Sequence, residues 1–432
     1  MNKLNMIKTS IDNKFPCKNI DIHEFVKLER IPEKTYERIL NYFESKYHFK
    51  NGEKMQLGNY YVKLDKRFSD SFVAFIKEVL KGKYENISSI EGFKPSIETL
   101  IDIEAKGDFT FGSFDMAVTE KGLQNIEFQA VATYPISAAK MNTMVLNSIS
   151  DSNAFVFAEN MNTNWDDFIK FYNKIFQVEG SQEVVLVDRE IDKQKTKFEF
   201  FATQKELNVP VKIVDIKEIL ENNDSLYYKN RNDFVKIKAL YNRVLITEAL
   251  YKDNYPEDSD SWKFRFDKKY NDLKYLNHPI KQFEISKRLC PYIEHEYNPN
   301  CYELSNTKHL FKQNDLHYKD FVWKHKWGAA GNDLILEPNE EILESLEEKI
   351  SNYIAQEKIK YKVFTTDDQL DKIVELRFMT AAYGEELIIV PMARIGYVEK
   401  TDEGTLNYRI HFSDNNKKGY GFSPVVLYDN IN

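Results

Sequence analysis

The sequence has few cysteines and no long apolar run, and these absences narrow the class of protein. Only Cys17, Cys290 and Cys301 occur, without CxxC spacing, so we expect a reducing compartment, no disulfide framework and no cysteine-based zinc site. No run approaches the roughly eighteen apolar residues of a membrane span. The first residues carry lysines but lack the apolar core of a secretory signal. We therefore expect a cytoplasmic protein with no membrane partner.

Motifs of covalent catalysis and of common nucleotide loops are also missing. The eight histidines show no close pair at metal-ligand spacing, and no Ser-His-Asp or Cys-His arrangement can be placed. The chain has no GxxxxGK[ST] phosphate loop and no internal repeat. Its 60 basic and 68 acidic residues give a net charge of −8, which offers no general attraction to nucleic acid.

Aromatic residues are abundant, and the length suits more than one domain. The 432 residues include 30 Phe and 26 Tyr, which is ample for real cores in about two or three lobes. Apolar spacing of three or four residues predicts helices over 31–49, 65–83, 95–103, 137–153, 165–179, 193–208, 216–222 and 338–354.

Strand patterns divide the chain into two parts. From residue 182 onward strands alternate with helices, which favours an open α/β sheet with helices on its faces. In the last third, the segment 319–336 predicts strand, glycine loop and strand. The segments 355–359, 371–384 and 385–400 predict three strands of one antiparallel sheet, the last two joined by a turn at Gly384.

The first candidate site is the stretch 112–130. Asp115 lies on an apolar run, and twelve residues later come Glu127 and, at the next alternate position, Gln129. A polar segment containing Gly122 separates them and predicts a turn between two strands. If these strands pair, alternation puts the three side chains on one face. Such hard oxygen ligands suit Mg²⁺ that also carries substrate phosphates; a hairpin whose polar face meets water is the alternative.

The second candidate site begins at a strand that ends in Lys324 or Lys326. The loop after it contains Gly328 and Gly331, and two glycines this close let backbone N–H groups approach a phosphate while a lysine supplies charge. An ordinary hairpin turn, with the lysines on the solvent face of an edge strand, would show the same pattern.

Polar residues on later strands extend this site. The strand 353–359 becomes polar at Gln356 and Glu357, and such an edge can offer backbone groups and a carboxylate to an adenosine. Arg394 follows the apolar run LIIVPMA, where an arginine costs desolvation unless it meets an anion. Arg377 lies two residues from Glu375 on one strand face, so it either forms an ion pair with Glu375 or has a function.

These segments together resemble an ATP-grasp protein. FVWKHKWGAAGNDLIL is similar to the lysine strand and lid loop of that family, and YIAQEKI to its adenine-holding hinge strand. The acidic group precedes the hinge here, an order that resembles the circularly permuted group typified by the glutathionylspermidine synthetase domain. That group carries G-R-F-D followed by E-x-N, where this sequence has G-S-F-D and E-F-Q.

The resemblance implies a role for each matching residue. Ser113 and Gln129 depart from the family pattern, which has an arginine and an asparagine at these places. The implied roles are Mg²⁺ binding by Asp115, Glu127 and Gln129, ATP-phosphate binding by Lys324 with Lys326 beside it, a lid formed by Gly328 and Gly331, adenosine contacts from Gln356 and Glu357, and contact with the transferred phosphate by Arg394.

The resemblance also implies a fold and an activity. The expected fold is a mixed α+β and α/β ATP-grasp fold in permuted order with antiparallel sheets. Its expected parts are a helical N-terminal region (1–94), a metal-binding part of the core (95–150), an α/β pre-grasp-like lobe (151–274) and the nucleotide-binding lobes (275–432).

The implied activity is an ATP- and Mg²⁺-dependent ligase that joins a small-molecule or peptide carboxylate to an amine through an acyl phosphate. A small-molecule kinase and a non-catalytic nucleotide-binding protein of the same fold remain as alternatives. Arg243, which follows an apolar strand, either binds a substrate carboxylate or is an ion-paired or surface arginine.

Overall fold

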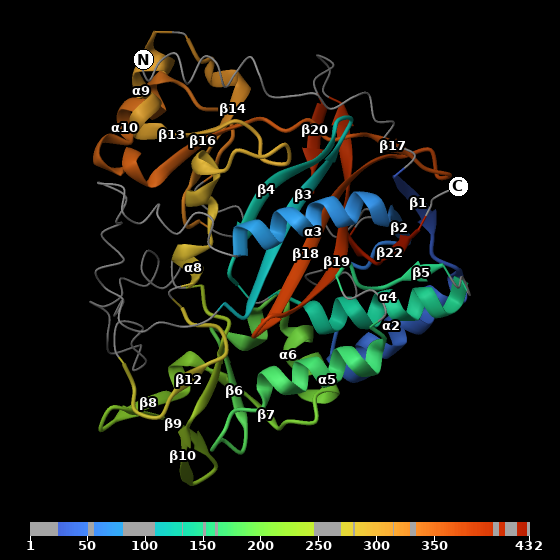
Figure 1. Cartoon of the computed structure of the whole chain (residues 1–432), viewed down its shortest axis with the longest axis vertical. Coiled ribbons are helices and arrows are strands. Elements are labelled where there is room, and N and C mark those ends of the chain that lie inside the picture. Colours follow the sequence, from blue (N-terminus) through green and yellow to red (C-terminus); the bar gives the residue numbers. More distant parts are fainter. Residues whose placement is uncertain are drawn as a thin grey trace.

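The structure is a computed structural model that describes residues 25–50, 56–80, 109–131, 133–149, 153–159, 163–245, 269–279, 281–313, 315–328, 334–400, 406–410 and 421–429. Within these residues the strands form five sheets (Figure 1). The helix expected over 95–103 lies outside them. None of the described helices is long and apolar enough to span a bilayer.

A seven-stranded sheet forms the centre of the molecule. Its main path has the order β20-β19-β18-β3-β4, with β17 (Phe364–Thr365) on β18 and β21 (Gly421–Ser423) on β19. The expected hairpins are confirmed, including the turn at Gly384, whose φ is 60°. The strands of the main path are β3 (Phe111–Thr119), β4 (Gly122–Gln129), β18 (Asp371–Tyr383), β19 (Glu386–Lys400) and β20 (Leu406–Arg409).

The two faces of this sheet differ in chemistry. On one face Phe114, Leu376 and Phe378 pack under helix α3 (Lys66–Leu80), and the Phe72 and Phe378 ring centroids lie 4.5 Å apart. Figure 1 shows α3 crossing this face. Since side chains alternate along a strand, the neighbouring positions point to the other face. That face carries the charged residues Asp115, Glu127, Glu375, Arg377 and Arg394.

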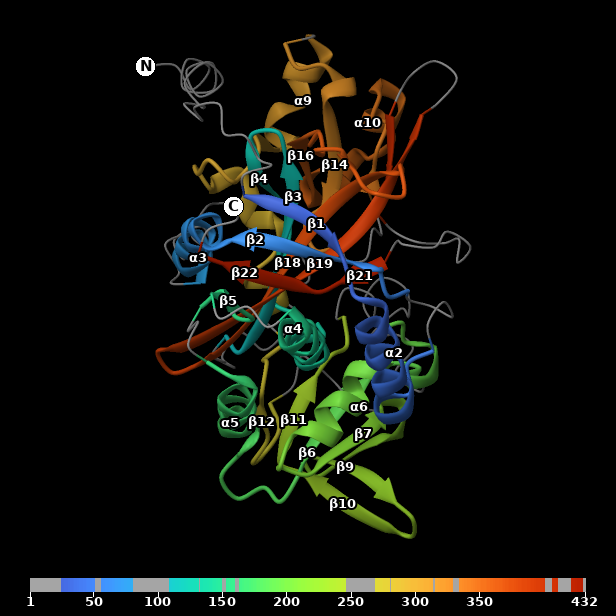
Figure 2. The same ribbon diagram turned by 90° about the vertical axis from the view of Figure 1, so that its right-hand side faces the viewer.

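The N-terminal part was expected to be helical, but it also contains strands. Helices α2 (Glu33–Tyr47) and α3 are present, but β1 (Val26–Arg30) and β2 (Tyr60–Asp65) belong to a sheet of order β1-β2-β22-β5. Strand β2 pairs in parallel with β22 (Val425–Tyr428), far away in the sequence. The remaining strand is β5 (Ala154–Phe155). Figure 2 shows β1, β2 and β22 side by side across the middle of the molecule.

The expected open α/β sheet is present, with four parallel strands in the order β12-β11-β6-β7. The helix expected over 216–222 is wrong: a short 3-10 turn (Ile216–Glu218) leads into β8, which begins a three-stranded sheet of order β10-β9-β8. Asn223 and Asp224 take φ of 48° and 55°, the geometry of a two-residue hairpin turn, so the chain reverses there. The strands of the two sheets are β6 (Val184–Asp188), β7 (Val211–Asp215), β11 (Ala239–Asn242), β12 (Lys274–Tyr275), β8 (Ile219–Asn222), β9 (Ser225–Asn230) and β10 (Asp233–Ile237).

The fifth sheet has the order β13-β16-β14-β15 and lies at the end of the molecule opposite to the α/β sheet (Figure 1). It confirms the two expected strands on either side of the glycine loop, whose residues 329–333 lie outside the described ranges. It also corrects one expectation, because β16 is not in the sheet of β18 and β19. Trp323 pairs with Ala355, and both are fully buried in the core of this lobe. The expected helix 338–354 is divided into α10 and a 3-10 segment, since Glu347 takes a φ of 41°. The elements are β13 (Cys301–Glu303), β14 (Phe321–His325), β15 (Leu334–Ile335), β16 (Tyr353–Glu357), α9 (Leu304–Lys312) and α10 (Glu340–Ser345).

Helix α4 (Pro135–Ile149) begins against a buried carboxylate. Glu199, from α6 (Lys197–Glu206), accepts hydrogen bonds from the backbone N–H groups of Ile136 and Ser137, both at 2.9 Å, and from Ser137 Oγ at 2.6 Å. These donors have no partner within the helix, and the carboxylate meets the positive end of its dipole. Burial nevertheless raises the pKa of Glu199 to about 7.

We expect Glu199→Ala to lower the free energy of unfolding by about 2 to 4 kcal/mol, because it leaves two buried N–H groups without an acceptor. The raised pKa means that the folded chain binds the Glu199 proton more tightly than the unfolded chain between about pH 4.5 and 7. The stability contributed by this group therefore falls as pH rises through that window. The loss in the variant should be larger at pH 5 than at pH 7.5.

Urea unfolding at the two pH values measures both effects. The matched control is Glu179→Ala, at an exposed position after helix α5 (Trp165–Phe176), which should change stability by less than about 0.5 kcal/mol. Equal losses for the two variants would show that Glu199 does not support α4.

Candidate functional site

The first candidate site forms on the polar face of the central sheet. Strands β3 and β4 pair so that Asp115 lies directly opposite Glu127, and Ser113 opposite Gln129. Directly opposed residues point to the same face, so the expected meeting of Asp115, Glu127 and Gln129 is confirmed. The register shifts after Asp115. This bulge leaves Ile126 as the extra residue of β4.

Both carboxylates have a cation of their own. Arg377 on β18 lies opposite Asp115; its Nε donates to Oδ1 at 2.6 Å, and its Nη2 donates to Oδ2. Lys287 Nζ lies 2.8 Å from Glu127 Oε2. The expected alternative of an Arg377–Glu375 ion pair is wrong, because the sheet register brings Arg377 to Asp115 instead.

Glu375 pairs with Arg394 on the neighbouring strand, with Nη1 and Oε1 3.0 Å apart. Burial raises the pKa of Glu375 to about 7 despite Arg394. Burial acts most strongly on Glu127 and would raise its pKa, but the charge and hydrogen bond of Lys287, together with the charges of Lys324 and Arg377, outweigh burial and lower the pKa to about 2. The carboxylates of this face thus differ in how firmly they stay ionised.

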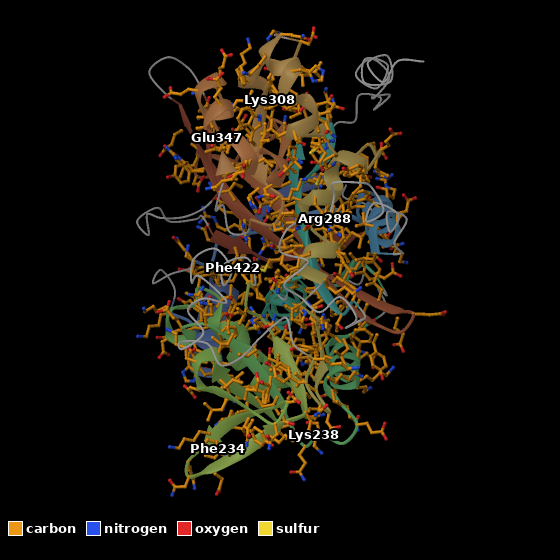
Figure 3. The ribbon with its side chains drawn as sticks, turned by 90° about the vertical axis from the view of Figure 1, so that its left-hand side faces the viewer. Phe234, Lys238, Arg288, Lys308, Glu347 and Phe422 are labelled. Atoms are coloured by element: carbon orange, nitrogen blue, oxygen red, sulfur yellow. The ribbon has the colours of Figure 1, made fainter. Side chains whose placement is uncertain are left out.

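Lys287 is a residue that the sequence analysis missed. It opens a short 3-10 segment, η6 (Lys287–Tyr292), and its Nζ also donates to the carbonyl oxygen of Gly328. Figure 3 labels the next residue, Arg288, in the middle of the molecule, between the end that carries Lys308 and the end that carries Phe234. The only sequence feature at this place is a pair of basic residues before an apolar stretch, which is too common to indicate a site.

The second candidate site lies against the first. Lys324 Nζ donates to Ile126 O at 2.9 Å, and Gln356 Nε2 donates to Asn125 O at 3.1 Å. Residues from β14 and β16 therefore hold the bulged part of β4. Burial lowers the pKa of Lys324, while Glu127 acts to raise it. The buried Gln356 Oε1 has no hydrogen-bond partner among the described residues.

The other expected nucleotide residues lie around this contact. Lys326 is buried in an ion pair with Glu303, with Nζ 2.6 Å from Oε2. Glu357 is exposed at the end of β16 and accepts from Asn300 Nδ2 at 2.9 Å. Gly331 lies outside the described residues. The lobe therefore presents Lys324, rather than Lys326, to the hairpin.

A third polar group lies where the α/β sheet reverses its strand order. Chain order runs from β6 outward to β7 on one side and to β11 on the other, and ligands commonly bind at the carboxyl ends of strands at such a point. Arg243 follows β11; its Nη1 donates to Thr133 O at 2.7 Å, and its Nε lies 3.9 Å from Asp188 Oδ2. Thr133 Oγ1 is buried without a hydrogen-bond partner among the described residues, and the same holds for Ser113 Oγ on β3 of the central sheet. Buried polar atoms are usually paired, so a polar ligand would satisfy these hydroxyls.

The donors at Asp115, Glu127 and Gln129 fit Mg²⁺ in kind, since all are hard oxygens on one sheet face. Over the described ranges no group of three or more His, Cys, Asp or Glu side chains is placed to hold a metal ion. A metal here would therefore depend on the Gln129 amide, on water and on oxygens of a substrate such as phosphate.

Comparisons with known proteins bear on the fold. No protein-family model matches the sequence, and no curated protein matches it significantly. The structure is similar to that of a glutathione synthetase-like effector from Globodera pallida in its apo form, with a TM-score of 0.52 and 11% identity, over 88% of this chain and 96% of that chain. A Methylobacillus flagellatus protein that carries the name gamma-glutamylcysteine synthetase matches at a TM-score of 0.36 and 10% identity, over 82% and 91% of the two chains. The chain therefore shares the fold of the glutathione synthetase-like effector.

Proposed function

We propose that this chain is an ATP- and Mg²⁺-dependent carbon–nitrogen ligase with the ATP-grasp fold in circularly permuted order. It would join a small-molecule or peptide carboxylate to an amine and release ADP and phosphate. The observation that carries the proposal is the cross-strand pair of Asp115 and Glu127 with Lys324 and Lys287 beside it. Opposed carboxylates and ammonium groups at one place are what a metal-bound polyphosphate requires. The fold shared with a glutathione synthetase-like protein supports it.

The nucleotide would lie between the two sheets that meet at the bulge of β4. Lys324 and Lys287 would bind its phosphates, and the backbone of Gly328 and Gly331 would close over them. Gln356 and Glu357 on β16 would contact the adenosine, and the free Gln356 Oε1 supports this place for a polar ligand. Lys326 would support the strand end through Glu303.

Catalysis would rest on positioning and charge. A carboxylate oxygen of the substrate attacks the γ-phosphorus, the bond to the β–γ bridging oxygen breaks, and ADP leaves. The amine nitrogen then attacks the acyl carbon and phosphate leaves, with the amine proton passing to solvent. Bound Mg²⁺ would supply neutralisation of phosphate charge, held by Asp115, Glu127 and Gln129. Arg394 would face the transferred phosphoryl group and offset its charge. Because the substrate carboxylate itself attacks the phosphorus, the chain needs no nucleophilic side chain.

The acyl substrate would extend from the polar sheet face toward Arg243. The unpartnered hydroxyls of Ser113 and Thr133 lie on β3 and just after β4, and Arg243 contacts the Thr133 carbonyl. A substrate with a second anionic group could satisfy these donors. A cytoplasmic location remains a prediction from the cysteine content.

A substrate panel tests the proposal. The chain is mixed with MgATP and candidate acids and amines, and ADP and phosphate are followed. With an ¹⁸O-labelled carboxylate, one label should appear in the released phosphate, because the acyl phosphate shares that oxygen. ADP formed without any amine, together with a phosphorylated product, would identify a kinase instead. Nucleotide binding without turnover across the panel would identify a non-catalytic protein, and AMP with pyrophosphate would exclude the acyl-phosphate route.

A further inference from the structure

The polar sheet face has enough cations to neutralise its carboxylates. Asp115, Glu127 and Glu375 are balanced by Arg377, Lys287 and Arg394 in ion pairs. Lys324 adds a further positive charge beside Glu127. With every group ionised, the face is therefore positive. A free divalent cation would enter a positive field, whereas a metal–triphosphate complex brings net negative charge.

The ion pair between Arg377 and Asp115 uses the same carboxylate oxygens that a metal would need. Both oxygens of Asp115 accept from the guanidinium, and both residues are buried, at 2% and 6% exposure. A metal bound at Asp115 would share that carboxylate with a buried guanidinium, and two cations at one carboxylate repel strongly in a low-dielectric site. Arg377 must therefore acquire another anion when a metal arrives.

The surroundings of Arg377 permit such an exchange. A guanidinium fork binds phosphate in the same bidentate manner as it binds carboxylate. Its Nη1 lies 3.4 Å from Tyr134 OH, and its central carbon lies 5.6 Å from the centre of the Tyr134 ring. The ring can hold the guanidinium nearby while the hydrogen bonds change partner.

Resting on the proposed function, we propose that Arg377 and Lys287 are counter-ions that exclude free divalent cations from Asp115 and Glu127. They move to phosphate oxygens when a nucleoside triphosphate enters with its metal. The site thus selects the metal–nucleotide complex over the metal alone, and Arg377 is the main determinant of this selectivity because it uses both oxygens of its carboxylate.

Binding of Mn²⁺, followed through the electron paramagnetic resonance of the free ion, tests this directly. The full chain should show no saturable Mn²⁺ binding alone at millimolar metal, and saturable binding once a non-hydrolysable ATP analogue is present. Arg377→Met should make binding of Mn²⁺ alone at least about tenfold tighter. Lys287→Met should also tighten the binding of Mn²⁺ alone. This second variant serves if circular dichroism shows that Arg377→Met does not fold.

Two controls separate counter-ion exchange from a general charge effect. Arg377→Lys keeps the charge but not the fork that occupies both Asp115 oxygens, so its affinity for Mn²⁺ alone should lie between those of the parent chain and Arg377→Met. Arg409→Met removes an arginine from an exposed pair with Glu399 in the same sheet, and should leave Mn²⁺ binding unchanged.

Equally tight Mn²⁺ binding with and without the nucleotide analogue would overturn the inference while leaving the proposed function intact. Unchanged Mn²⁺ affinity in both Arg377→Met and Lys287→Met would do the same. A parent chain that binds neither metal nor nucleotide would overturn the proposed function and the inference with it.

Discussion

Asp115→Asn should lower Mg²⁺-dependent ADP formation by at least about a thousandfold, an effect of about 4 kcal/mol on the transition state. Asp115 lies directly opposite Glu127 and is 2% exposed. Asparagine keeps the shape and one acceptor oxygen, so the change removes mainly the negative charge. A steady-state coupled assay for ADP at saturating MgATP measures the loss.

The same variant leaves Arg377 with a neutral partner, so its folding must be checked. Breaking a buried ion pair costs about 3 to 5 kcal/mol when one partner is left alone, and the remaining amide oxygen should reduce this cost. Urea unfolding gives the stability of the variant. The matched control is Asp367→Asn, which removes an exposed carboxylate paired with Arg30, and should leave turnover unchanged. Turnover of Asp115→Asn within about threefold of the parent chain would contradict a metal role for Asp115.

Lys324→Met should weaken binding of the Mg²⁺–ATP analogue complex by about a hundredfold, or about 2.7 kcal/mol. Lys324 is buried, and its ammonium lies against the bulge of β4 beside Glu127. Methionine retains most of the apolar stem, so the variant loses the charge more than the packing. Removal of that charge should also raise the pKa of Glu127. Isothermal titration calorimetry with a non-hydrolysable analogue measures the affinity.

Lys326→Met provides the contrast. Its ammonium pairs with Glu303 rather than facing the hairpin, so we expect lower stability but an affinity within about threefold of the parent chain. If Lys326→Met weakened nucleotide binding more than Lys324→Met, the lobe would present the other lysine to the phosphates and the site would need to be rebuilt.

The hairpin could be predicted because its determinants are local. Alternation along β4 fixes the face of Glu127 and Gln129, and the polar segment with Gly122 fixes the turn. The residues that neighbouring strands bring to the hairpin could not be predicted from local patterns. Arg377 lies 262 residues from Asp115, and its face was expected correctly. Only the register between β18 and β3 shows that it meets Asp115 instead of Glu375.

The same distinction explains the other corrections. Strand β2 depends on parallel pairing with β22 at the far end of the chain, and β16 depends on β14 for its sheet. The local pattern identified β16 as a strand but not the sheet to which it belongs, and it did not identify β2 as a strand at all. The error at 216–222 is different, because its cause is local: a two-residue turn at Asn223 and Asp224 reverses a chain whose apolar spacing also fits a helix.

The central claim is that one sheet face of this chain holds a metal–nucleotide complex between its hairpin and Lys324. A crystal structure with Mg²⁺ and a non-hydrolysable ATP analogue tests it most directly. We expect oxygens of Asp115 and Glu127 about 2.0 to 2.1 Å from the metal, with Lys324 on the phosphates and Arg377 turned from Asp115 to a phosphate oxygen. Nucleotide bound elsewhere on the molecule, with the Arg377–Asp115 pair intact, would contradict the account.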